Sequence, residues 1–346
     1  MRNTRLLNAL NMQEVDSTPV WVMRQAGRYL PEYRKIRSEV KDFMTLCKTP
    51  DLACEVTVQP LKRFDLDAAI LFSDILTIPE AMGLDLAFVS GEGPVFASTV
   101  RSQRDVEQLG CPDPNDELGY VMDAIQHVKH ELNNSVPLIG FSGSPWTLAT
   151  YMVEGRGSKQ FAEIRKMLYS SPEILHNLLE KLAQSVTHYL KAQIDVGVDV
   201  VMLFDSWGGV LTPQTYQAFS LQYMTQIISS IKAYSDVPII LFTKGGGLWL
   251  NEIVGAGSQG VGIDWTIPMK QAKKIIGDRA CIQGNLDPAV LYGSVTQIEM
   301  EVQRILQEFG SGNGHIFNLG HGIYPDVDPD NVSAMISAIR KFSCKK

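Results

Sequence analysis

The sequence has none of the features that place a chain in a membrane, on nucleic acid or in a disulfide scaffold. No stretch approaches the ~18 apolar residues that cross a bilayer, and the N-terminus has no apolar segment that would direct secretion. The five cysteines are odd in number and form no Cys-x-x-Cys pair, which favours reduced thiols in the cytoplasm. The 31 lysines and arginines against 38 aspartates and glutamates give a net charge of −7, and there is no basic run to attract nucleic acid. We therefore expect a cytoplasmic protein that binds neither nucleic acid nor a membrane, and in which any anionic ligand needs a local basic cluster.

What the sequence does contain is enough apolar material for a large core. Hydrophobic residues make up 45% of the 346 residues and charged residues 20%, which are ordinary globular values. At this size roughly three quarters of the unfolded chain's surface can be buried without disulfide support. The length would allow two average domains, but one α/β barrel commonly takes ~250 residues or more, and no long linker or internal repeat is visible. We expect residues 1–346 to form a single domain.

Eight short apolar runs recur along the chain, each bounded by polar or glycine-rich turns. Because they are mostly apolar rather than alternating, they are typical of parallel strands buried on both faces. The runs are Pro19–Met23, Ala68–Phe72, Pro137–Phe141, Asp199–Phe204, Pro238–Phe242, Gly260–Asp264, Arg279–Gln283 and His315–Leu319.

Helices with clear start signals lie between these runs. Ser171-Pro172 places a capping serine before proline, apolar residues then repeat at helical spacing over 175–190, and Gly197 follows. Thr49-Pro50, Thr212-Pro213 and Asp287-Pro288 predict further helix starts of the same kind. Strand followed by helix, eight times, predicts an α/β fold of the (β/α)₈ TIM-barrel type. A doubly wound sheet is the alternative, but no Gly-x-Gly-x-x-Gly follows the first run.

The connection between the second and third predicted strands, about residues 75–136, is long enough to be an insertion. Its part 87–95 contains Gly91, Gly93 and Pro94, and predicts a hairpin or loop rather than a second domain.

Barrel enzymes place their chemistry at the C-terminal ends of the strands, so the residues that follow each run are the candidates. Arg24 and Arg28 follow the first run, four residues apart, with Gly27 between them. Guanidinium groups suit carboxylate or phosphate, so the pair predicts an anion site, with ion pairs to acidic residues elsewhere as the alternative. Arg34 and Arg37 extend the basic stretch, although each alone is typical of a surface residue.

Ser73 and Asp74 follow the second run, Asp205 follows the fourth, and Asp264 ends the sixth. An acid there can be an acid–base group, a metal ligand, a counter-ion for a cation formed in the reaction, or a structural carboxylate. His321 stands between two glycines, which favours a functional loop residue. Lys244 precedes three glycines and could form a Schiff base, contact phosphate or make an ion pair; we favour the ion pair.

The sequence gives little support to a metal site. It contains no His-x-x-x-His, His-x-Cys or Cys-x-x-Cys arrangement. Carboxylates alone would allow Mg²⁺, but nothing in the pattern demands it.

Two long segments carry a family resemblance. Residues Trp21–Arg34 and Gly140–Gly155 closely resemble the two signature segments of the uroporphyrinogen decarboxylase family. The resemblance covers essentially the whole chain and includes Phe72–Leu76, Phe242–Gly245 and Gly320–Gly322.

This resemblance implies a carboxy-lyase of porphyrin and heme biosynthesis that uses no cofactor or metal, has a (β/α)₈ fold, and is usually a cytosolic homodimer. It removes four acetate carboxyl groups from uroporphyrinogen III and gives coproporphyrinogen III. In this family the acid matched by Asp74 contacts the pyrrole N–H groups, and Ala26 binds through its backbone. The catalytic positions would be Asp74, Arg28 and Arg37. The substrate-binding positions would be Arg24, Gln25, Ala26, Gly27, Arg28, Asp74, Tyr151, Ser206 and His321.

The chemistry suits these residue types. Loss of CO₂ leaves carbanion character, and a pyrrole protonated on carbon can accept those electrons. An ionised carboxylate beneath the ring would favour that cation, which is the hypothesis for Asp74. Arg28 or Arg37 would orient the acetate being lost, while Tyr151 and His321 would hold other carboxylates. An arginine is an awkward general acid because of its high pKa, so water or the substrate's own carboxyl could supply the proton.

Three other functions remain open at this point. A zinc-dependent methyltransferase on the same barrel would need His and Cys ligands, which Phe242–Gly245 lacks. A lyase could form a Schiff base on Lys244, and a tetrapyrrole carrier would bind without reacting.

Overall fold

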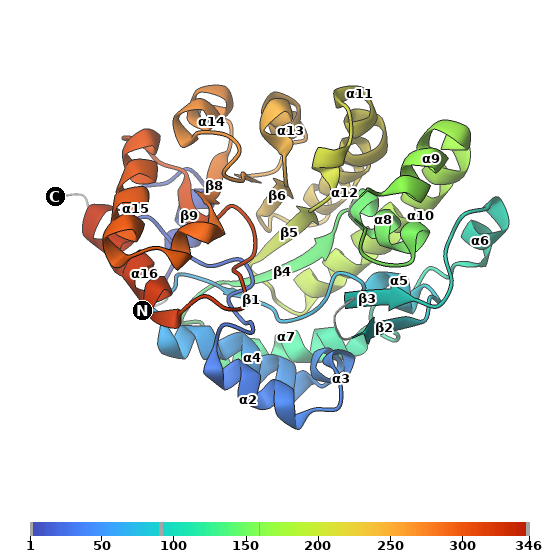
Figure 1. The fold of residues 1–346 in the computed structure, drawn as a ribbon, viewed down its shortest axis with the longest axis horizontal. Helices are drawn as coiled ribbons and strands as arrows, with labels where there is room; N and C mark the ends of the chain where they lie inside the picture. Colours follow the sequence, from blue (N-terminus) through green and yellow to red (C-terminus); the bar gives the residue numbers. More distant parts are fainter. Residues whose placement is uncertain (1–2, 90–92, 159, 344–346) are drawn as a thin grey trace.

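A curved parallel sheet organises the fold, with helices along its outer side (Figure 1). The computed structural model describes residues 3–89, 93–158 and 160–343; Gly91 of the predicted hairpin and Cys344 lie outside them. Within those residues seven strands pair in the order β1-β4-β5-β6-β7-β8-β9, and every pair is parallel. The strands are β1 (Ala69–Ile70), β4 (Leu138–Gly143), β5 (Val200–Asp205), β6 (Ile239–Thr243), β7 (Gly260–Gly262), β8 (Cys281–Leu286) and β9 (His315–Leu319).

The first predicted strand is the exception. Over 19–23 the described chain forms only an isolated parallel bridge between Val20 and Phe317, so the prediction of an eighth ladder strand is wrong for this structure. The segment still lies between the two sheet edges. The Phe317 N–H donates to the carbonyl of Pro19 at 2.8 Å on the β9 side, and the Asp67 N–H donates to Val20 at 2.8 Å on the β1 side.

Side chains take the place of the ladder along this segment. The Val20 N–H donates to Asp67 Oδ2 at 2.7 Å, and the Met23 N–H donates to Asn318 Oδ1 at 2.9 Å. Backbone donors satisfied by side chains make no ladder bonds, which explains why an apolar run of strand type is not a strand here.

Sixteen α-helices and four short helical turns accompany the sheet in the described residues. The α-helices are α1 (Arg5–Leu10), α2 (Pro31–Glu39), α3 (Phe43–Lys48), α4 (Pro50–Arg63), α5 (Thr77–Ala81), α6 (Gln103–Gln108), α7 (Gly119–Leu132), α8 (Pro145–Glu154), α9 (Ala162–Ser170), α10 (Pro172–Asp195), α11 (Pro213–Tyr216), α12 (Gln222–Lys232), α13 (Leu250–Gly255), α14 (Met269–Ile276), α15 (Val295–Phe309) and α16 (Pro329–Ser343). The turns are η1 (Gly208–Val210), η2 (Gln217–Leu221), η3 (Gly246–Trp249) and η4 (Pro288–Tyr292).

Three of the four predicted Pro-led helix starts open α-helices, at α4, α10 and α11. The fourth, at Asp287-Pro288, also begins a helix, but this is the short 3₁₀ segment η4. Asp287 is its N-cap, and the side chain accepts from the Ala289 N–H at 2.9 Å. The α-helix begins later, where Ser294 and Gln297 form a capping box.

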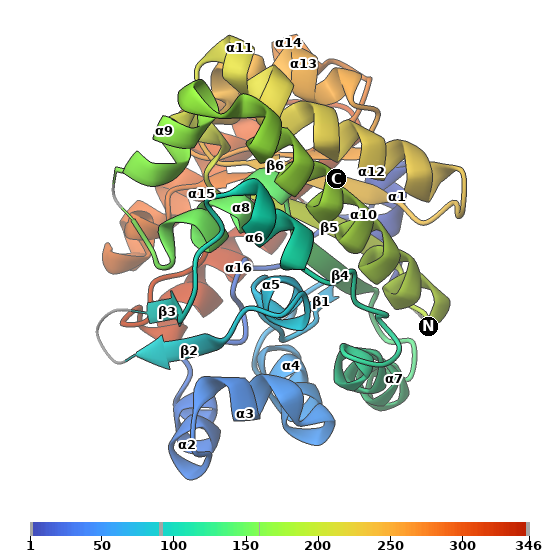
Figure 2. The same ribbon diagram turned by 90° about the vertical axis from the view of Figure 1, so that its right-hand side faces the viewer.

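The long connection between β1 and β4 contains the predicted hairpin, formed by β2 (Leu86–Val89) and β3 (Gly93–Phe96). The Phe88 ring lies 4.6 Å from the Phe43 ring of α3, and the Phe96 N–H donates to Gly155 at the end of α8. Figure 2 shows the hairpin beside α3, at the edge of the helical layer. The same connection supplies α7, which packs on α4.

The inside of the curved sheet is filled by apolar side chains, including Ile139, Met202 and Ile240, all with no exposed surface. Helix α1 covers the N-terminal ends of the strands, because its residues Leu6 and Leu10 belong to this inner cluster. The core therefore fills one end of the sheet, and the C-terminal ends of the strands are left for chemistry.

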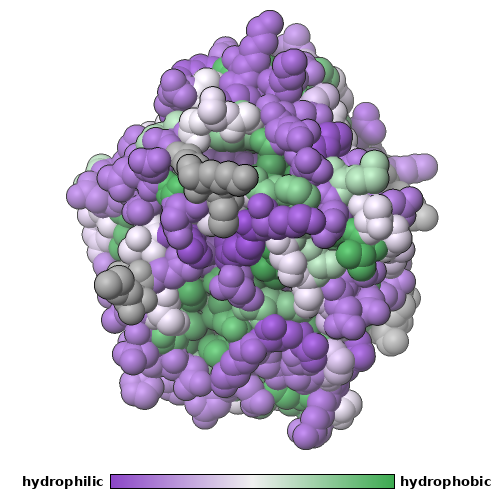
Figure 3. Space-filling view, turned by 90° about the vertical axis from the view of Figure 1, so that its left-hand side faces the viewer, coloured by the Kyte–Doolittle hydropathy of each residue, from purple (hydrophilic) through white to green (hydrophobic). Residues whose placement is uncertain are grey.

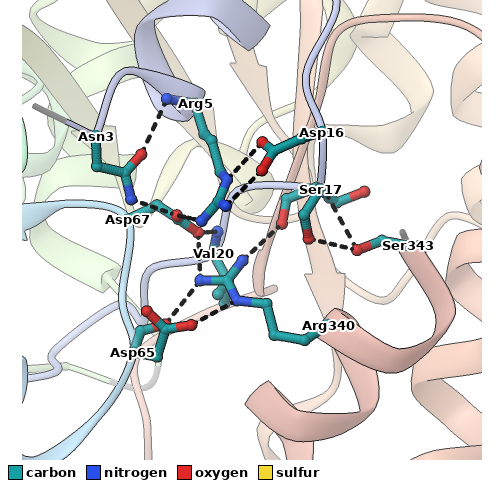
Figure 4. A network of polar contacts seen from close by, with 10 residues as sticks. Asn3, Arg5, Asp16, Ser17, Val20, Asp65, Asp67, Arg340 and Ser343 are labelled. Carbon is teal, nitrogen blue, oxygen red and sulfur yellow. Dashed lines mark hydrogen bonds and ion pairs between the residues drawn. The ribbon is translucent and has the colours of Figure 1, made fainter. Parts of the chain in front are cut away.

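A buried carboxylate joins both ends of the described chain to the sheet (Figure 4). Asp67, with no exposed surface, accepts from Asn3 Nδ2 at 2.7 Å, Arg5 Nη1 at 3.1 Å and Arg340 Nη2 at 2.8 Å, besides the Val20 N–H. Because it unites α1, α16 and the segment at 19–23, this Asp67 cluster fixes the edge where the sheet's first and last strands approach each other.

The outer surface on the side of α15 and α16 is mostly hydrophilic, with its broadest hydrophobic area below the centre of the view and smaller ones around it (Figure 3). Among the described residues, every helix is too short or too polar to span a bilayer.

Candidate active site

Arg24 is held at the strand ends by the loop that follows β9. Its backbone has a φ of +65°, and the residue before it is fixed by the Asn318 side chain and by the Ile323 N–H, which donates to the Met23 carbonyl at 3.0 Å. The Arg24 side chain runs over Gly322, where a Cβ would overlap it. The glycine after His321 is therefore required for the guanidinium to lie across this loop.

His321 is half-buried in the same loop, with its ring 6.2 Å from that of Phe242. Burial, together with the positive charges of Arg24 and Lys244, lowers the pKa of His321 to about 3. The imidazole is therefore neutral at physiological pH, and offers one N–H donor and one acceptor nitrogen.

Asp74 is a half-buried carboxylate directly beyond β1. The Leu76 N–H donates to Asp74 Oδ1 at 2.8 Å, and the Thr77 hydroxyl donates to the Asp74 carbonyl at 2.9 Å, so the residue is held in a tight turn. Burial raises the pKa of Asp74, against the opposing effects of the Leu76 N–H and the Arg24 charge. Among the described residues Asp74 forms no ion pair, and Oδ2 has no hydrogen-bond donor.

Tyr151, on α8, brings a phenol to the same place. Its ring lies 6.4 Å from that of Trp207, and burial raises its pKa. The charge of Asp74 also raises this pKa, while that of Arg24 lowers it. Arg24, Asp74, Tyr151 and His321 thus gather within electrostatic reach of one another, although they come from four separate parts of the chain.

Arg28 lies in the loop before α2, and Arg37 lies in α2 itself. Both oppose the effect of burial on Tyr33, whose pKa is raised to about 12. Arg37 and Asp74 both act on the buried thiol of Cys47 in α3, which links Arg37 to the neighbourhood of Asp74. In the part of the chain that the structure describes, neither these arginines nor Arg24 forms an ion pair with a carboxylate. The alternative of structural ion pairs for Arg24 and Arg28 is therefore wrong.

Other residues of the first loop serve its shape. Gln25 is buried and donates from Nε2 to the Ala68 carbonyl at 3.1 Å, so its side chain braces the loop and any substrate contact falls to its backbone. Arg34 folds back and donates to the Arg28 carbonyl at 2.8 Å. Ala26 packs against the core, and a Cβ at Gly27 would lie 2.9 Å from the Arg24 carbonyl oxygen.

The other strand-end acids are structural. Asp205 has no exposed surface and accepts from three hydroxyls, those of Ser144 at 2.7 Å, Thr147 at 2.9 Å and Ser220 at 2.7 Å. Burial nevertheless raises its pKa. Ser206 follows it, half-buried, at the end of β5.

Asp264 ties the loops after β6 and β7 together. Its Oδ2 accepts from the Gly245 N–H at 2.6 Å, and its Oδ1 accepts from the Thr266 N–H at 2.9 Å. Both carboxylate oxygens are thus used by the fold itself.

Lys244 does not make the predicted ion pair with any described residue; its Nζ instead lies 5.9 Å from the centre of the Trp265 ring. That prediction is wrong because the nearby acids, Asp205 and Asp264, are satisfied by neutral donors.

An aromatic layer beneath these polar groups was missed by the sequence reasoning. The rings of Phe141, Phe204 and Phe242 follow one another at 5.6 and 6.1 Å, edge to face, and His321 lies on the last of them. The signal was the aromatic residue at or near the end of three consecutive predicted strands.

Residues 3–89, 93–158 and 160–343 include no group of three or more His, Cys, Asp or Glu that could hold a metal ion. Within these ranges, the candidate site thus contains arginine and lysine side chains without ion pairs, the Asp74 carboxylate with one oxygen that has no donor, and the aromatic layer.

Comparison with known proteins gives consistent results. The profile of the family Uroporphyrinogen decarboxylase (URO-D) matches residues 1–342. A uroporphyrinogen decarboxylase of Tolumonas auensis is 60% identical over 346 residues, covering 99% of this chain and 98% of the relative. One of Idiomarina loihiensis is 57% identical, covering 99% and 97%.

Solved structures show the same fold at low identity. A methyltransferase from Methanosarcina mazei superposes with a TM-score of 0.83 at 22% identity, covering 98% of both chains. A B12-independent methionine synthase from a Shewanella species gives 0.57 at 10% identity, covering 84% of this chain and 87% of its own. At these identities the likeness speaks for the fold alone.

Proposed function

The chain belongs to the uroporphyrinogen decarboxylase family, and on that premise we propose that the strand-end site binds uroporphyrinogen III and decarboxylates it. The enzyme is a carboxy-lyase of porphyrin and heme biosynthesis. Each decarboxylation converts one acetate side chain of the substrate into a methyl group. The C–C bond to the carboxylate breaks, CO₂ leaves, and one proton is taken up. Four such steps give coproporphyrinogen III.

The observation that carries this proposal is a cluster of cations without acidic partners in a protein of net charge −7. Arg24 lies within electrostatic reach of Asp74, and Arg24, Arg28, Arg37 and Lys244 form no ion pair with any described carboxylate. Unpaired guanidinium groups in one place are suited to an anion of high charge. Uroporphyrinogen carries eight carboxylates around its rim and pyrrole N–H groups at its centre. The cationic side chains would bind the carboxylates, and Asp74 would accept from the pyrrole N–H groups.

Asp74 supplies the electrostatic part of the mechanism. Protonation of a pyrrole carbon creates a cation, and the electrons of the breaking C–C bond flow into it. Asp74 Oδ1 is occupied by the Leu76 N–H, so Oδ2 is the oxygen that accepts from pyrrole N–H groups. A carboxylate already fixed in position can stabilise such a cation by several kcal/mol when water is excluded.

The remaining residues position the substrate. Arg28 or Arg37 orients the acetate that is lost, and Arg24 grips the rim. Tyr151, Ser206 and the neutral imidazole of His321 hold further carboxylates through O–H and N–H donors. Backbone groups of Gln25, Ala26 and Gly27 complete the contact. Water or the substrate's own carboxyl delivers the proton, because arginine has too high a pKa to be an effective acid.

The proposal extends to the whole molecule. We propose that the segment at 19–23 completes a single-domain (β/α)₈ arrangement between β9 and β1, which its hydrogen bonds on both sides support. We propose a cytoplasmic homodimer, in keeping with the 89% exposure of Leu248 beside the site loop and the exposed, stacked rings of Tyr292 and Tyr324. Light scattering in solution tests this: a monomer at micromolar concentration would refute the dimer.

The test of function is anaerobic incubation with uroporphyrinogen III under reducing conditions, followed by oxidation and chromatography of the porphyrins. We expect conversion through the seven-, six- and five-carboxylate intermediates to the four-carboxylate product. Substrate that is bound but recovered unchanged would leave a tetrapyrrole carrier and refute the enzyme.

A further inference from the structure

A lysine without an acidic partner stands at the end of β6. Lys244 is half-buried, and among the described residues it forms neither an ion pair nor a side-chain hydrogen bond. Its Nζ lies 5.9 Å from the centre of the Trp265 ring, which leaves the charge without a carboxylate. A half-buried ammonium group that the fold does not neutralise is suited to bind an anion from outside.

The backbone beneath this lysine is held firmly. The Lys244 N–H donates to the Asp205 carbonyl at 3.1 Å, and the next N–H, of Gly245, donates to Asp264 Oδ2 at 2.6 Å. A Cβ at Gly209 would lie 2.5 Å from the Lys244 carbonyl oxygen, so the two loops touch backbone to backbone. The Asp205 carbonyl and the Asp264 carboxylate thus fix the loop backbone while leaving the ammonium group of Lys244 free.

The strand order places Lys244 across the site from the arginines. In the sequence β1-β4-β5-β6-β7-β8-β9, β6 is the middle strand, whereas Arg24 and Arg28 follow the segment between β9 and β1. His321, after β9, lies within the electrostatic reach of both Arg24 and Lys244. In strand order β6 is therefore as far as possible from the segment at 19–23, and Arg24 and Lys244 approach His321 from different parts of the sheet.

We propose that Lys244 binds a peripheral carboxylate of the macrocycle on the side opposite Arg24, Arg28 and Arg37. This inference rests on the proposed function and adds a substrate-binding residue to it. A ring with carboxylates around its whole rim needs positive charge on more than one side to be held flat over Asp74. The contact is ionic, because the carbonyl carbons of this substrate are all carboxylates, which form no Schiff base with an amine.

The experiment compares three variants. Lys244→Gln removes the charge, Lys244→Arg keeps it, and Lys273→Gln is a matched control. Lys273 is also half-buried and lies 4.0 Å from an aromatic centre, that of Phe309, but it belongs to α14 rather than to a strand-end loop. Each protein is assayed for kcat and KM with uroporphyrinogen III, and for equilibrium binding of uroporphyrin III by fluorescence.

We expect Lys244→Gln to weaken binding and raise KM about tenfold or more, with a smaller change in kcat. Raising the salt concentration should weaken binding less in this variant than in the parent, because one screened ion pair is gone. Lys244→Arg should keep most of the affinity, and Lys273→Gln all of it.

Unchanged binding and KM in Lys244→Gln, or an equal loss in Lys244→Arg, would overturn the inference while a decarboxylating parent leaves the proposed function intact. Conversely, a parent that binds uroporphyrin without turning over uroporphyrinogen, and whose binding weakens in Lys244→Gln, would overturn the proposed function and support the inference.

Discussion

Replacement of Asp74 by asparagine tests the mechanism most directly, because it removes a charge and keeps a shape. The Leu76 N–H donates to only one oxygen of Asp74, and an asparagine carbonyl can accept that bond in the same turn. Burial raises the pKa of Asp74, so the ionised form is the one that the folded protein disfavours. Asp74→Asn should therefore unfold at the same denaturant concentration as the parent or a higher one.

The loss of activity can be worked out from the charge alone. Two unit charges about 4 Å apart interact by about 4 kcal/mol at an effective dielectric constant of ~20. Because the Asp74 side chain keeps some contact with solvent, we reduce this to about 2–3 kcal/mol of transition-state stabilisation. The expected fall in kcat is then about 30- to 150-fold.

The pH profile gives a second readout. Asp74 must be ionised to favour the pyrrole cation, and its pKa is raised above the ordinary 3.8. As the pH falls through this raised pKa the carboxylate is protonated, so the parent should lose activity at a higher pH than an ordinary aspartate would dictate. Asp74→Asn should lack this acid limb.

The assay is single-turnover and steady-state decarboxylation under anaerobic conditions, with Asp113→Asn as the control. Asp113 also accepts from the N–H two residues on, that of Asn115 at 2.9 Å. Unlike Asp74, it is exposed and lies between α6 and α7, not directly after a strand of the parallel sheet. Activity of Asp74→Asn within threefold of the parent would refute the electrostatic role, provided that the control is also fully active.

Arg28→Ala should raise KM about tenfold and lower kcat with no change in unfolding temperature, since the side chain is exposed and unpaired; substrate saturation curves and calorimetry check both parts. Asp205→Ala should lower the free energy of unfolding by about 3 kcal/mol in urea titrations, because three buried hydroxyls lose their acceptor. His315 is buried, which lowers its pKa from 6.5 to about 4. Between these two pKa values the unfolded chain binds more protons than the folded one. The free energy of unfolding should therefore fall by about 2 kcal/mol between pH 7.5 and 5 because of His315. His315→Gln should lack this part of the pH dependence of stability.

The sequence predicts most of the fold because buried parallel strands are continuous apolar runs. Seven of the eight predicted runs contain a strand of the sheet, and the hairpin inside the long connection is also confirmed. The run at 19–23 fails because its hydrogen-bonding partners, Asp67 and Asn318, are side chains distant in sequence, which no local pattern reveals. Asp287-Pro288 begins a helix as predicted, but the local pattern does not show that this helix is a short 3₁₀ segment.

For the site, sequence reasoning identifies the strand ends but cannot rank the acids found there. Asp74, Asp205 and Asp264 look alike in the sequence, and they differ only in what donates to them. Three hydroxyls contributed by α8, its N-cap and η2 make Asp205 structural, whereas Asp74 keeps one oxygen without a donor. Lys244 was assigned an ion pair for the same reason: the neutral donors that already occupy nearby carboxylates are visible only in three dimensions.

The Asp67 cluster has a consequence for how this chain is made. Asp67 and Arg340 are 273 residues apart, so a chain emerging from the ribosome carries the carboxylate long before its last cationic donor exists. Until α16 is free to dock, that acid can be covered only with an incomplete set of donors, which a buried charge tolerates poorly. The Asp67 cluster is therefore complete only after α16 has been synthesised, and a nascent chain released before α16 should be degraded rather than persist as a folded enzyme.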